Sequence, residues 1–272
     1  MEPKFYKTQN VIKSYTKPLV LIIACMLLVY TSCRKDSSSS KPSTTTQPPS
    51  NEALSSQIAV NLSQSLAGSF GGVNLNDGVD SVSVADHLGP HHACGCGSSN
   101  PLCGFFTDSL VNVNTTEGDS VTIHTGGELK FYFNCDANNK LSGYTANDSL
   151  NTVRTNASSV SQYNVKQFYN IKALDSNHQF IGVDGNNGCV STVTYNGNPT
   201  AIRNGVFYQF TNLTIDVVKK DILSGTATFD ASGNNWDLHG TIKFLGNHMA
   251  DFTMKDSGQT YHVNLITGKM TQ

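Results

Sequence analysis

Residues 238–254 read LHGTIKFLGNHMADFTM, and this stretch decides the fold class. Small or apolar residues alternate with other residues on both sides of a central Gly246-Asn247 pair. Alternation of this kind buries one side of an extended strand, and a two-residue Gly/Asn turn folds the chain straight back on itself. The stretch therefore predicts two antiparallel strands joined by a tight turn.

The same pattern continues through the second half of the chain. Val206, Tyr208 and Phe210 alternate, and a phase shift of one residue before Leu213 predicts a β-bulge. Other strand signals are residues 120–125, 129–134 and 261–265, and other turn signals are Asn196-Gly197, Ser232-Gly233 and Ser257-Gly258. Short connections force antiparallel neighbours, because parallel crossovers need about a dozen residues. We predict a mainly β domain, an antiparallel meander over residues 105–272, arranged as a sandwich or a long curved sheet; a closed barrel would produce the same pattern.

A helix is predicted ahead of these strands, over residues 51–69 (NEALSSQIAVNLSQSLAGS). Leu54, Ile58, Leu62 and Leu66 recur every four residues, which places them on one face of a helix. A helix with a single apolar face has to bury that face against something larger. We therefore expect one amphipathic helix packed on the β domain.

The N-terminus has the composition of an export signal. Four lysines precede residues 19–30 (LVLIIACMLLVY), an uncharged apolar run. A helix rises about 1.5 Å per residue, so this run spans about 18 Å, which is short for a hydrocarbon core of about 30 Å. The run fits the apolar region of a signal peptide better than a transmembrane helix.

Thr31, Ser32 and Cys33 follow this run and precede a polar segment, which resembles the lipobox of bacterial lipoproteins. The resemblance implies that residues 1–32 are a signal peptide and that Cys33 carries acyl chains such as palmitate. Cys25 also follows a matching Ile-Ile-Ala sequence, but its use would leave a very short apolar run. Arg34, where retention in the inner membrane would call for Asp, implies by the same resemblance the outer membrane of a Gram-negative cell, facing the periplasm or the cell surface.

Residues 33–50 follow as a tether rich in Ser, Thr and Pro, which we expect to be disordered. The remaining residues, 51–272, are predicted to form a single β-rich domain. No Lys or Arg occurs between Lys41 and Lys130. Nucleic acid is therefore excluded as a predicted partner, because phosphate binding needs clustered cations.

Residues 71–103 form a predicted loop rich in cysteine and histidine. His91, His92, Cys94 and Cys96 carry the ligand types of a zinc site, so a metal-binding module is one alternative. The cell envelope is oxidising, however, and this favours disulfides. The candidates for disulfide pairing are Cys94, Cys96, Cys103, Cys135 and Cys189, an odd number. We favour Cys103 with Cys135, since each adjoins a predicted strand, which leaves Cys94 and Cys96 competing for Cys189.

Two further patterns bear on surface chemistry. Trp236, Tyr208, Phe210, Tyr261 and Phe252 would suit either a platform for sugars or the sheet core, and the core is favoured because aromatic residues bury large areas in strands. An Asp-Ser-aliphatic pattern resembles the acceptor motif of an O-glycosylation system of some Gram-negative bacteria. It occurs at Ser81, Ser109, Ser120 and Ser149.

The familiar contiguous motifs of enzymes, such as G-x-S-x-G, H-E-x-x-H and the P-loop, are absent from the sequence. We therefore predict a lipid-anchored envelope protein that acts by binding or structure, needs no cofactor, and holds an envelope glycan, a peptide or a neighbouring protein near the membrane. The alternatives are an envelope hydrolase with a noncontiguous site, and the metal-binding module described above.

Overall fold

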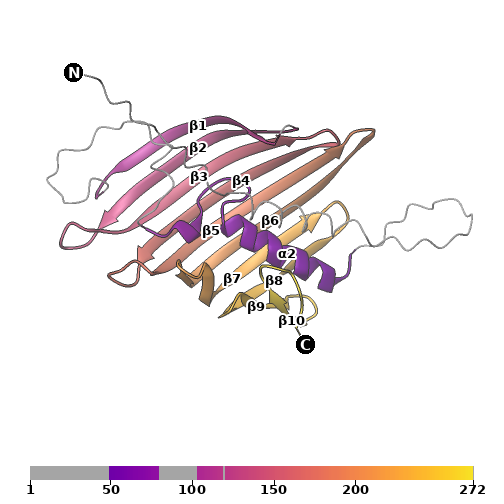
Figure 1. The fold of residues 1–272 in the computed structure, drawn as a ribbon. Helices are drawn as coiled ribbons and strands as arrows, with labels where there is room; N and C mark the ends of the chain where they lie inside the picture. Colours follow the sequence, from indigo (N-terminus) through magenta and orange to yellow (C-terminus); the bar gives the residue numbers. More distant parts are fainter. Residues whose placement is uncertain (1–48, 80–102, 119, 272) are drawn as a thin grey trace, which may run out of the picture. The chain divides into compact units, whose positions relative to one another are not determined.

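The structure is a computed structural model that describes residues 49–79, 103–118 and 120–271. Its helical elements are α2 (Asn51–Leu66) and the short 3₁₀ helix η2 (Leu75–Asp77) (Figure 1). Its strands are β1 (Phe106–Glu117), β2 (Val121–Cys135), β3 (Leu141–Thr155), β4 (Ser159–Ala173), β5 (Phe180–Tyr195), β6 (Asn198–Asp216), β7 (Asp221–Gly233), β8 (Asp237–Gly246), β9 (Met249–Met254) and β10 (Thr260–Asn264).

In the part of the chain that the structure describes, ten strands form one open sheet in the order of the sequence. Every neighbouring pair is antiparallel, from β1 against β2 to β9 against β10. The predicted mainly β meander is confirmed, and of the arrangements left open by the sequence it is a single long sheet. Asn247 and His248 both have positive φ (54° and 58°), as a tight hairpin turn requires.

The predicted bulge lies in β6. Pairing with β7 shifts register between Thr211 and Thr214, and Asn212 between them has a φ of 52°. The backbone N–H of Asn212 donates a hydrogen bond of 2.7 Å to Asp184 Oδ1 on β5. One extra residue in β6 explains why the alternation of buried residues changes phase between Phe210 and Leu213.

Two boundaries differ from the sequence prediction. Residues 121–125 and 129–134 belong to one continuous strand, β2, because the Gly126-Gly127 pair stays within the strand and pairs with Asn151 and Leu150. A side chain at Gly127 would collide with the backbone carbonyl of Ser149, so glycine permits close approach there and does not form a turn. The helix ends at Leu66, earlier than predicted.

Helix α2 packs its apolar side against one face of the sheet, as predicted (Figure 1). Leu54, Ile58, Leu62 and Leu66 are all buried. The Tyr208 hydroxyl on β6 donates a hydrogen bond of 3.0 Å to the carbonyl oxygen of Ile58. This bond ties the middle of α2 to the middle of the sheet.

The two faces of the sheet are therefore distinct. We call the side against which α2 and residues 67–79 pack the covered face, and the opposite side, against which no described helix packs, the open face. Because side chains alternate along a strand and paired residues share a face, register assigns each residue to one of them. No described helix is both long enough and apolar enough to cross a lipid bilayer.

Candidate functional site

Two exposed aromatic residues stand near the middle of the open face. Phe168 on β4 and Phe207 on β6 are 44% and 43% exposed. Strand β5 runs between them, where Asn186 pairs with Phe168 and Gly188 pairs with Phe207. Strand spacing of about 4.8 Å and a two-residue offset along the strands place the two residues roughly 10–12 Å apart.

Gly188 lies beside the Phe207 ring. A Cβ at Gly188 would lie 3.4 Å from Phe207 Cδ2, an ordinary contact distance, so the ring packs next to the backbone of β5. Alternation along β6 sends Phe207 to the open face because Val206 and Tyr208 are buried on the covered face. Phe207 therefore stands on the open face, next to a backbone position without a side chain.

Polar side chains surround these rings. We call the group the Phe168–Phe207 patch; it consists of Phe168, Phe207, Lys166, Asn186, Gln209 and Asp230, which register places together on the open face. Within it are two apolar rings, two amides, an ammonium group and a carboxylate. This combination gives stacking surfaces together with hydrogen-bond donors and acceptors.

A histidine extends the polar side of the patch. Asp230 pairs with Phe207 on one side and with His239 of β8 on the other. The His239 Nδ1 atom lies 2.5 Å from Asp230 Oδ1, and Nε2 lies 3.4 Å from Asp237 Oδ2. The hydrogen bond with Asp230, more than any other contact, raises the pKa of His239 above its ordinary value.

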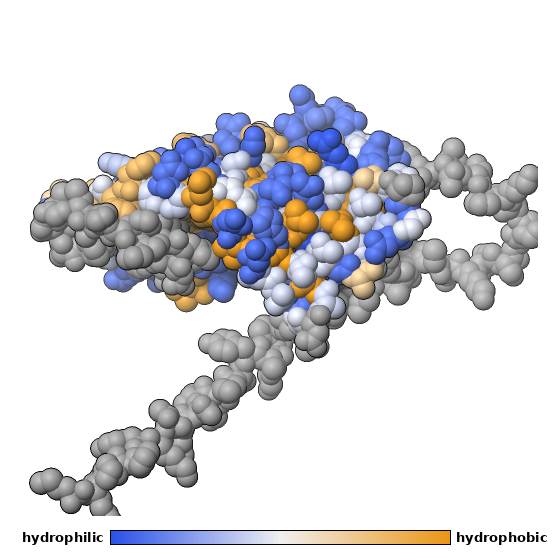
Figure 2. Space-filling view, turned by 90° about the horizontal axis from the view of Figure 1, so that it is seen from above, coloured by the Kyte–Doolittle hydropathy of each residue, from blue (hydrophilic) through white to orange (hydrophobic). Residues whose placement is uncertain are grey.

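A second exposed aromatic pair lies on the open face near the β1 edge. Phe106 on β1 is paired with Tyr132 on β2, and both side chains are exposed. Figure 2 shows orange and blue residues interspersed over the side that it views. Singly exposed apolar residues are common on protein surfaces, so this pair by itself marks no large apolar interface.

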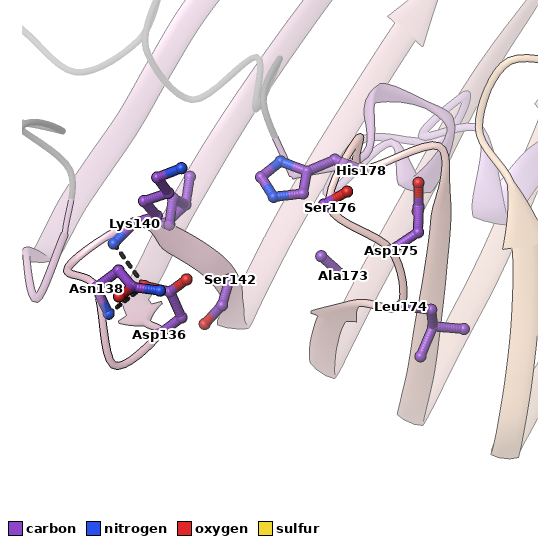
Figure 3. A pocket seen from close by; sticks show the side chains of 10 residues that line it. Asp136, Asn138, Lys140, Ser142, Ala173, Leu174, Asp175, Ser176 and His178 are labelled. Atoms are coloured by element: carbon purple, nitrogen blue, oxygen red, sulfur yellow. Dashed lines mark hydrogen bonds between the residues drawn. The ribbon is translucent and has the colours of Figure 1, made fainter.

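A cleft of about 680 Å³ between the β2–β3 and β4–β5 turns is a second candidate (Figure 3). Its carboxylates are already occupied. Asp136 Oδ1 accepts hydrogen bonds from the backbone N–H groups of Asn138 and Lys140, both 2.8 Å long, and Asp175 accepts one from Phe180. These backbone bonds lower the pKa of Asp136 and of Asp175, as expected of turn-capping aspartates. Both carboxylates of the cleft are therefore engaged in stabilising the turns that form it.

A third polar cluster lies on the covered face. Asp148, Gln167 and Asn187 form one row across β3, β4 and β5, and all three are buried. The Val73 N–H donates to Gln167 Oε1 (2.8 Å), and Asn187 Nδ2 donates to the Tyr169 hydroxyl (2.8 Å). The backbone of residues 72–73 lies over this row, which closes it from solvent.

Within that row, Asp148 carries a buried carboxyl group that lacks hydrogen-bond partners. Neither of its carboxylate oxygens has a hydrogen-bond partner of good geometry. Burial raises the pKa of Asp148 to about 7, and the nearby backbone N–H groups of Val73 and Gln167 offset this only in part. The hydrogen bond between Val73 and Gln167 holds the segment of residues 72–73 against the sheet.

The aromatic residues singled out in the sequence are mostly core. Tyr208, Phe210 and Phe252 are fully buried, while Trp236 and Tyr261 are partly buried and pack against the core. The interpretation as sheet core, which we favoured, is therefore correct. The exposed phenylalanines and tyrosines of the described chain are Phe106, Tyr132, Phe168 and Phe207, none of which the sequence analysis named. The available signal was the alternation itself, since placing Tyr208 inside implies that Phe207 points outward.

The favoured cysteine pair lies together in the structure. Cys103 and Cys135 are joined as a disulfide, with Cα atoms 5.5 Å apart, next to β1 and at the end of β2. Cys189 is buried on the covered face and is not bonded to another described cysteine. Burial raises the pKa of its thiol to about 11, which keeps it protonated and unreactive at neutral pH.

The remaining predicted sites lie largely outside the described residues. This applies to the acylation candidates Cys33 and Cys25, to His91, His92, Cys94 and Cys96, and to Ser81. No group of three His, Cys, Asp or Glu residues within the described ranges is placed to hold a metal ion. Of the O-glycosylation candidates, Ser120 and Ser149 are exposed, and Ser109 is half-buried beside Thr107 (3.1 Å between hydroxyl oxygens).

No protein-family model, no curated protein and no solved structure matches this chain.

Proposed function

We propose that this protein is a lipid-anchored protein of the bacterial cell envelope that binds a glycan on the Phe168–Phe207 patch. The observation that carries this proposal is the pair of exposed rings, seated on opposite sides of β5. Sugar rings have an apolar C–H face and a rim of hydroxyl groups, so they bind where aromatic faces and planar polar groups alternate.

The composition of the patch favours a glycan over a protein partner. The core of a stable protein interface is depleted of charged residues. Here Lys166 and Asp230 stand directly beside the rings in the register of the sheet. Side-chain amides at Asn186 and Gln209 can each donate to and accept from hydroxyl groups, which suits a ligand with many of them.

The proposed acylation of Cys33 is consistent with the same role in binding an envelope glycan. With Cys33 acylated, residues 33–50 would link the domain to the membrane through a flexible chain. A tethered binding domain needs neither a deep pocket nor catalytic groups to hold an envelope polymer close to the membrane. Cys33 and the outer membrane are both part of this proposal.

The binding test uses the purified protein in affinity electrophoresis through gels that contain neutral or acidic polysaccharides. We expect retardation by at least one glycan, and we expect Phe207→Ala and Phe168→Ala each to weaken it about tenfold, the loss of one stacking contact of about 1.4 kcal/mol. Leu245→Ala removes an exposed apolar side chain on β8 and serves as the control. Retardation by no glycan, or equal losses in all three variants, contradicts the proposal. Binding only to envelope proteins would point to the protein-partner alternative.

The anchor is tested separately by mass spectrometry of the mature N-terminal peptide. The expected result is an acylated peptide that begins at Cys33. An acylated peptide beginning at Cys25 would move the cleavage site, and an unmodified N-terminus would remove the anchor from the proposal while leaving the glycan test unaffected.

A further inference from the structure

The two edges of the sheet are protected very differently. At the C-terminal edge, β10 has only five residues. Its outer side is already paired: Asn264 N–H donates to the Lys269 carbonyl (2.8 Å), and the His262 carbonyl accepts from Thr271 N–H (3.0 Å). The chain after β10 therefore turns back and covers this edge.

Among the described residues, no strand or other segment protects the β1 edge in this way. Strand β1 has 12 residues and pairs with β2 without any register shift from Phe106 to Glu117. No described strand pairs with its other side. Natural edge strands are usually guarded by Lys, Pro, a bulge or a covering segment. The sequence of β1, FTDSLVNVNTTE, contains no Lys, Arg or Pro.

The open face of β1 also carries unusual apolar exposure. Leu110 is 87% exposed, the highest value among the large exposed apolar residues of the described chain, and Phe106 is 57% exposed. Both lie on the same face of the strand, four residues apart. An exposed, regular and unguarded edge with apolar side chains is the arrangement that favours pairing with another strand.

We propose that β1 pairs with β1 of a second copy of this chain, antiparallel, about a two-fold axis at Leu110. This register sets Leu110 opposite Leu110 of the partner subunit and shields both. It sets Asp108 opposite Asn112 of the partner subunit, so the carboxylates stay apart. An axis at Asp108 would instead bring two carboxylates face to face, and like charges directly opposite are destabilising.

The symmetry of this pairing has a structural consequence. A two-fold axis perpendicular to a continuous sheet keeps both open faces on the same side. The two Phe168–Phe207 patches would then face the same way, and the dimer would hold a polymeric glycan at two points, with higher avidity than one patch. Only this consequence rests on the proposed function; the strand pairing stands without it.

The first test measures association of the full purified protein by sedimentation velocity over a range of concentrations. We expect a monomer–dimer equilibrium that Leu110→Lys weakens about tenfold or more, because a lysine guards the edge and removes the apolar contact. The matched control is Leu245→Lys, an exposed leucine on the same face of β8. A monomer at all concentrations, or equal weakening by both variants, overturns the proposal.

The second test fixes the register by mild oxidation of variants that each carry one added cysteine. Leu110→Cys places two thiols opposite each other across the axis, and we expect a disulfide between the two copies of the residue-110 peptide, identified by mass spectrometry. Asn114→Cys lies on the same strand, but its two copies would be eight residues apart in register, about 27 Å, and should not cross-link. Equal cross-linking of both variants, or no cross-link at residue 110, contradicts the proposed axis. Loss of glycan binding without loss of the dimer would leave this inference in place.

Discussion

Phe207 and Tyr208 are consecutive residues of β6, but their environments are opposite. Tyr208 is fully buried beneath α2 and hydrogen-bonded to it, whereas 43% of the Phe207 surface is exposed on the open face. The same contrast runs through the whole sheet, because each strand contributes alternate residues to both faces. What distinguishes the faces is the packing of α2 and residues 67–79, which cover only one of them.

This contrast separates stability from recognition. Apolar side chains on the covered face are packed against the helix, and their loss should weaken the fold. The side chains of Phe168 and Phe207 on the open face are 44% and 43% exposed, and their loss should change stability far less. The first prediction compares two phenylalanines on one strand.

Phe210→Ala should lower the free energy of unfolding by about 3–5 kcal/mol, because Phe210 is 2% exposed and its removal leaves a cavity. Phe207→Ala should change it by about 0.5 kcal/mol or less. Urea denaturation followed by circular dichroism measures both. Similar losses in the two variants would mean that the open face is packed against something in solution.

The second prediction concerns the buried carboxylate of the covered face. The pKa of Asp148 is raised to about 7 from an ordinary value of 3.8, so the folded protein binds more protons than the unfolded chain between these pH values. The contribution of Asp148 to stability should therefore be greatest at pH 4 and below, and should fall as the pH rises to about 7. One pKa unit corresponds to about 1.4 kcal/mol, which makes about 4 kcal/mol the upper limit.

Asp148→Asn removes the ionisation but keeps the shape of the side chain. We expect this variant to be about 2–4 kcal/mol more stable than the wild type at pH 8 and nearly equal to it at pH 4. Urea denaturation at a series of pH values measures the difference, with the exposed turn residue Asp256→Asn as a control. A wild-type stability that does not fall between pH 4 and pH 8 would show that the carboxylate finds a partner.

Much of the fold could be predicted from the sequence because it is set by local pattern. Alternation around Val206 and Tyr208, the Gly246-Asn247 turn and the apolar stripe of α2 all depend on neighbours within a few residues. The choice of a single sheet over a sandwich depends on how much surface one helix can cover, which no local pattern contains. Asp148 is the clearest case: its position in β3 follows from alternation, but its burial depends on residues 71–73 lying above it.

A third prediction tests how closely residue 72 packs against the covered face. Gly72 has a φ of 87°, and a Cβ there would collide with Gln167 Oε1 and lie 3.0 Å from Asp148 Oδ2. Gly197, in the β5–β6 turn, has a similar φ of 84° but open space around it. Gly197→Ala should therefore report the conformational cost alone, about 1 kcal/mol.

Gly72→Ala should cost about 1–2 kcal/mol more than Gly197→Ala, since residues 71–73 must also move away from the sheet. The same urea series measures both variants. Hydrogen exchange at Val73 adds a local readout, because its N–H is bonded to Gln167 and should lose protection only in Gly72→Ala. Equal costs for the two variants would argue against close contact between Gly72 and the buried row.

The smallest effect is expected from the charge pair on the open face. The pKa of His239 is raised chiefly by its hydrogen bond with Asp230, so the pair should stabilise the fold fully below the ordinary histidine pKa of 6.5 and lose this contribution as the pH rises through the folded value. The stability difference between wild type and His239→Gln should therefore be measurable at pH 5.5 and absent at pH 9.

Both Asp148 and His239 make the folded protein more stable at low pH, so salt is needed to tell them apart. His239 is exposed and its pair with Asp230 is screened by solvent, so about 1 M salt should remove its contribution and leave the Asp148 dependence in place. A double-mutant cycle with Asp230→Asn separates the pair from the rest of the surface. A salt-independent His239 effect as large as that of Asp148 would mean that this part of the open face is buried in solution, as it would be if a partner or a further segment of the chain covered it.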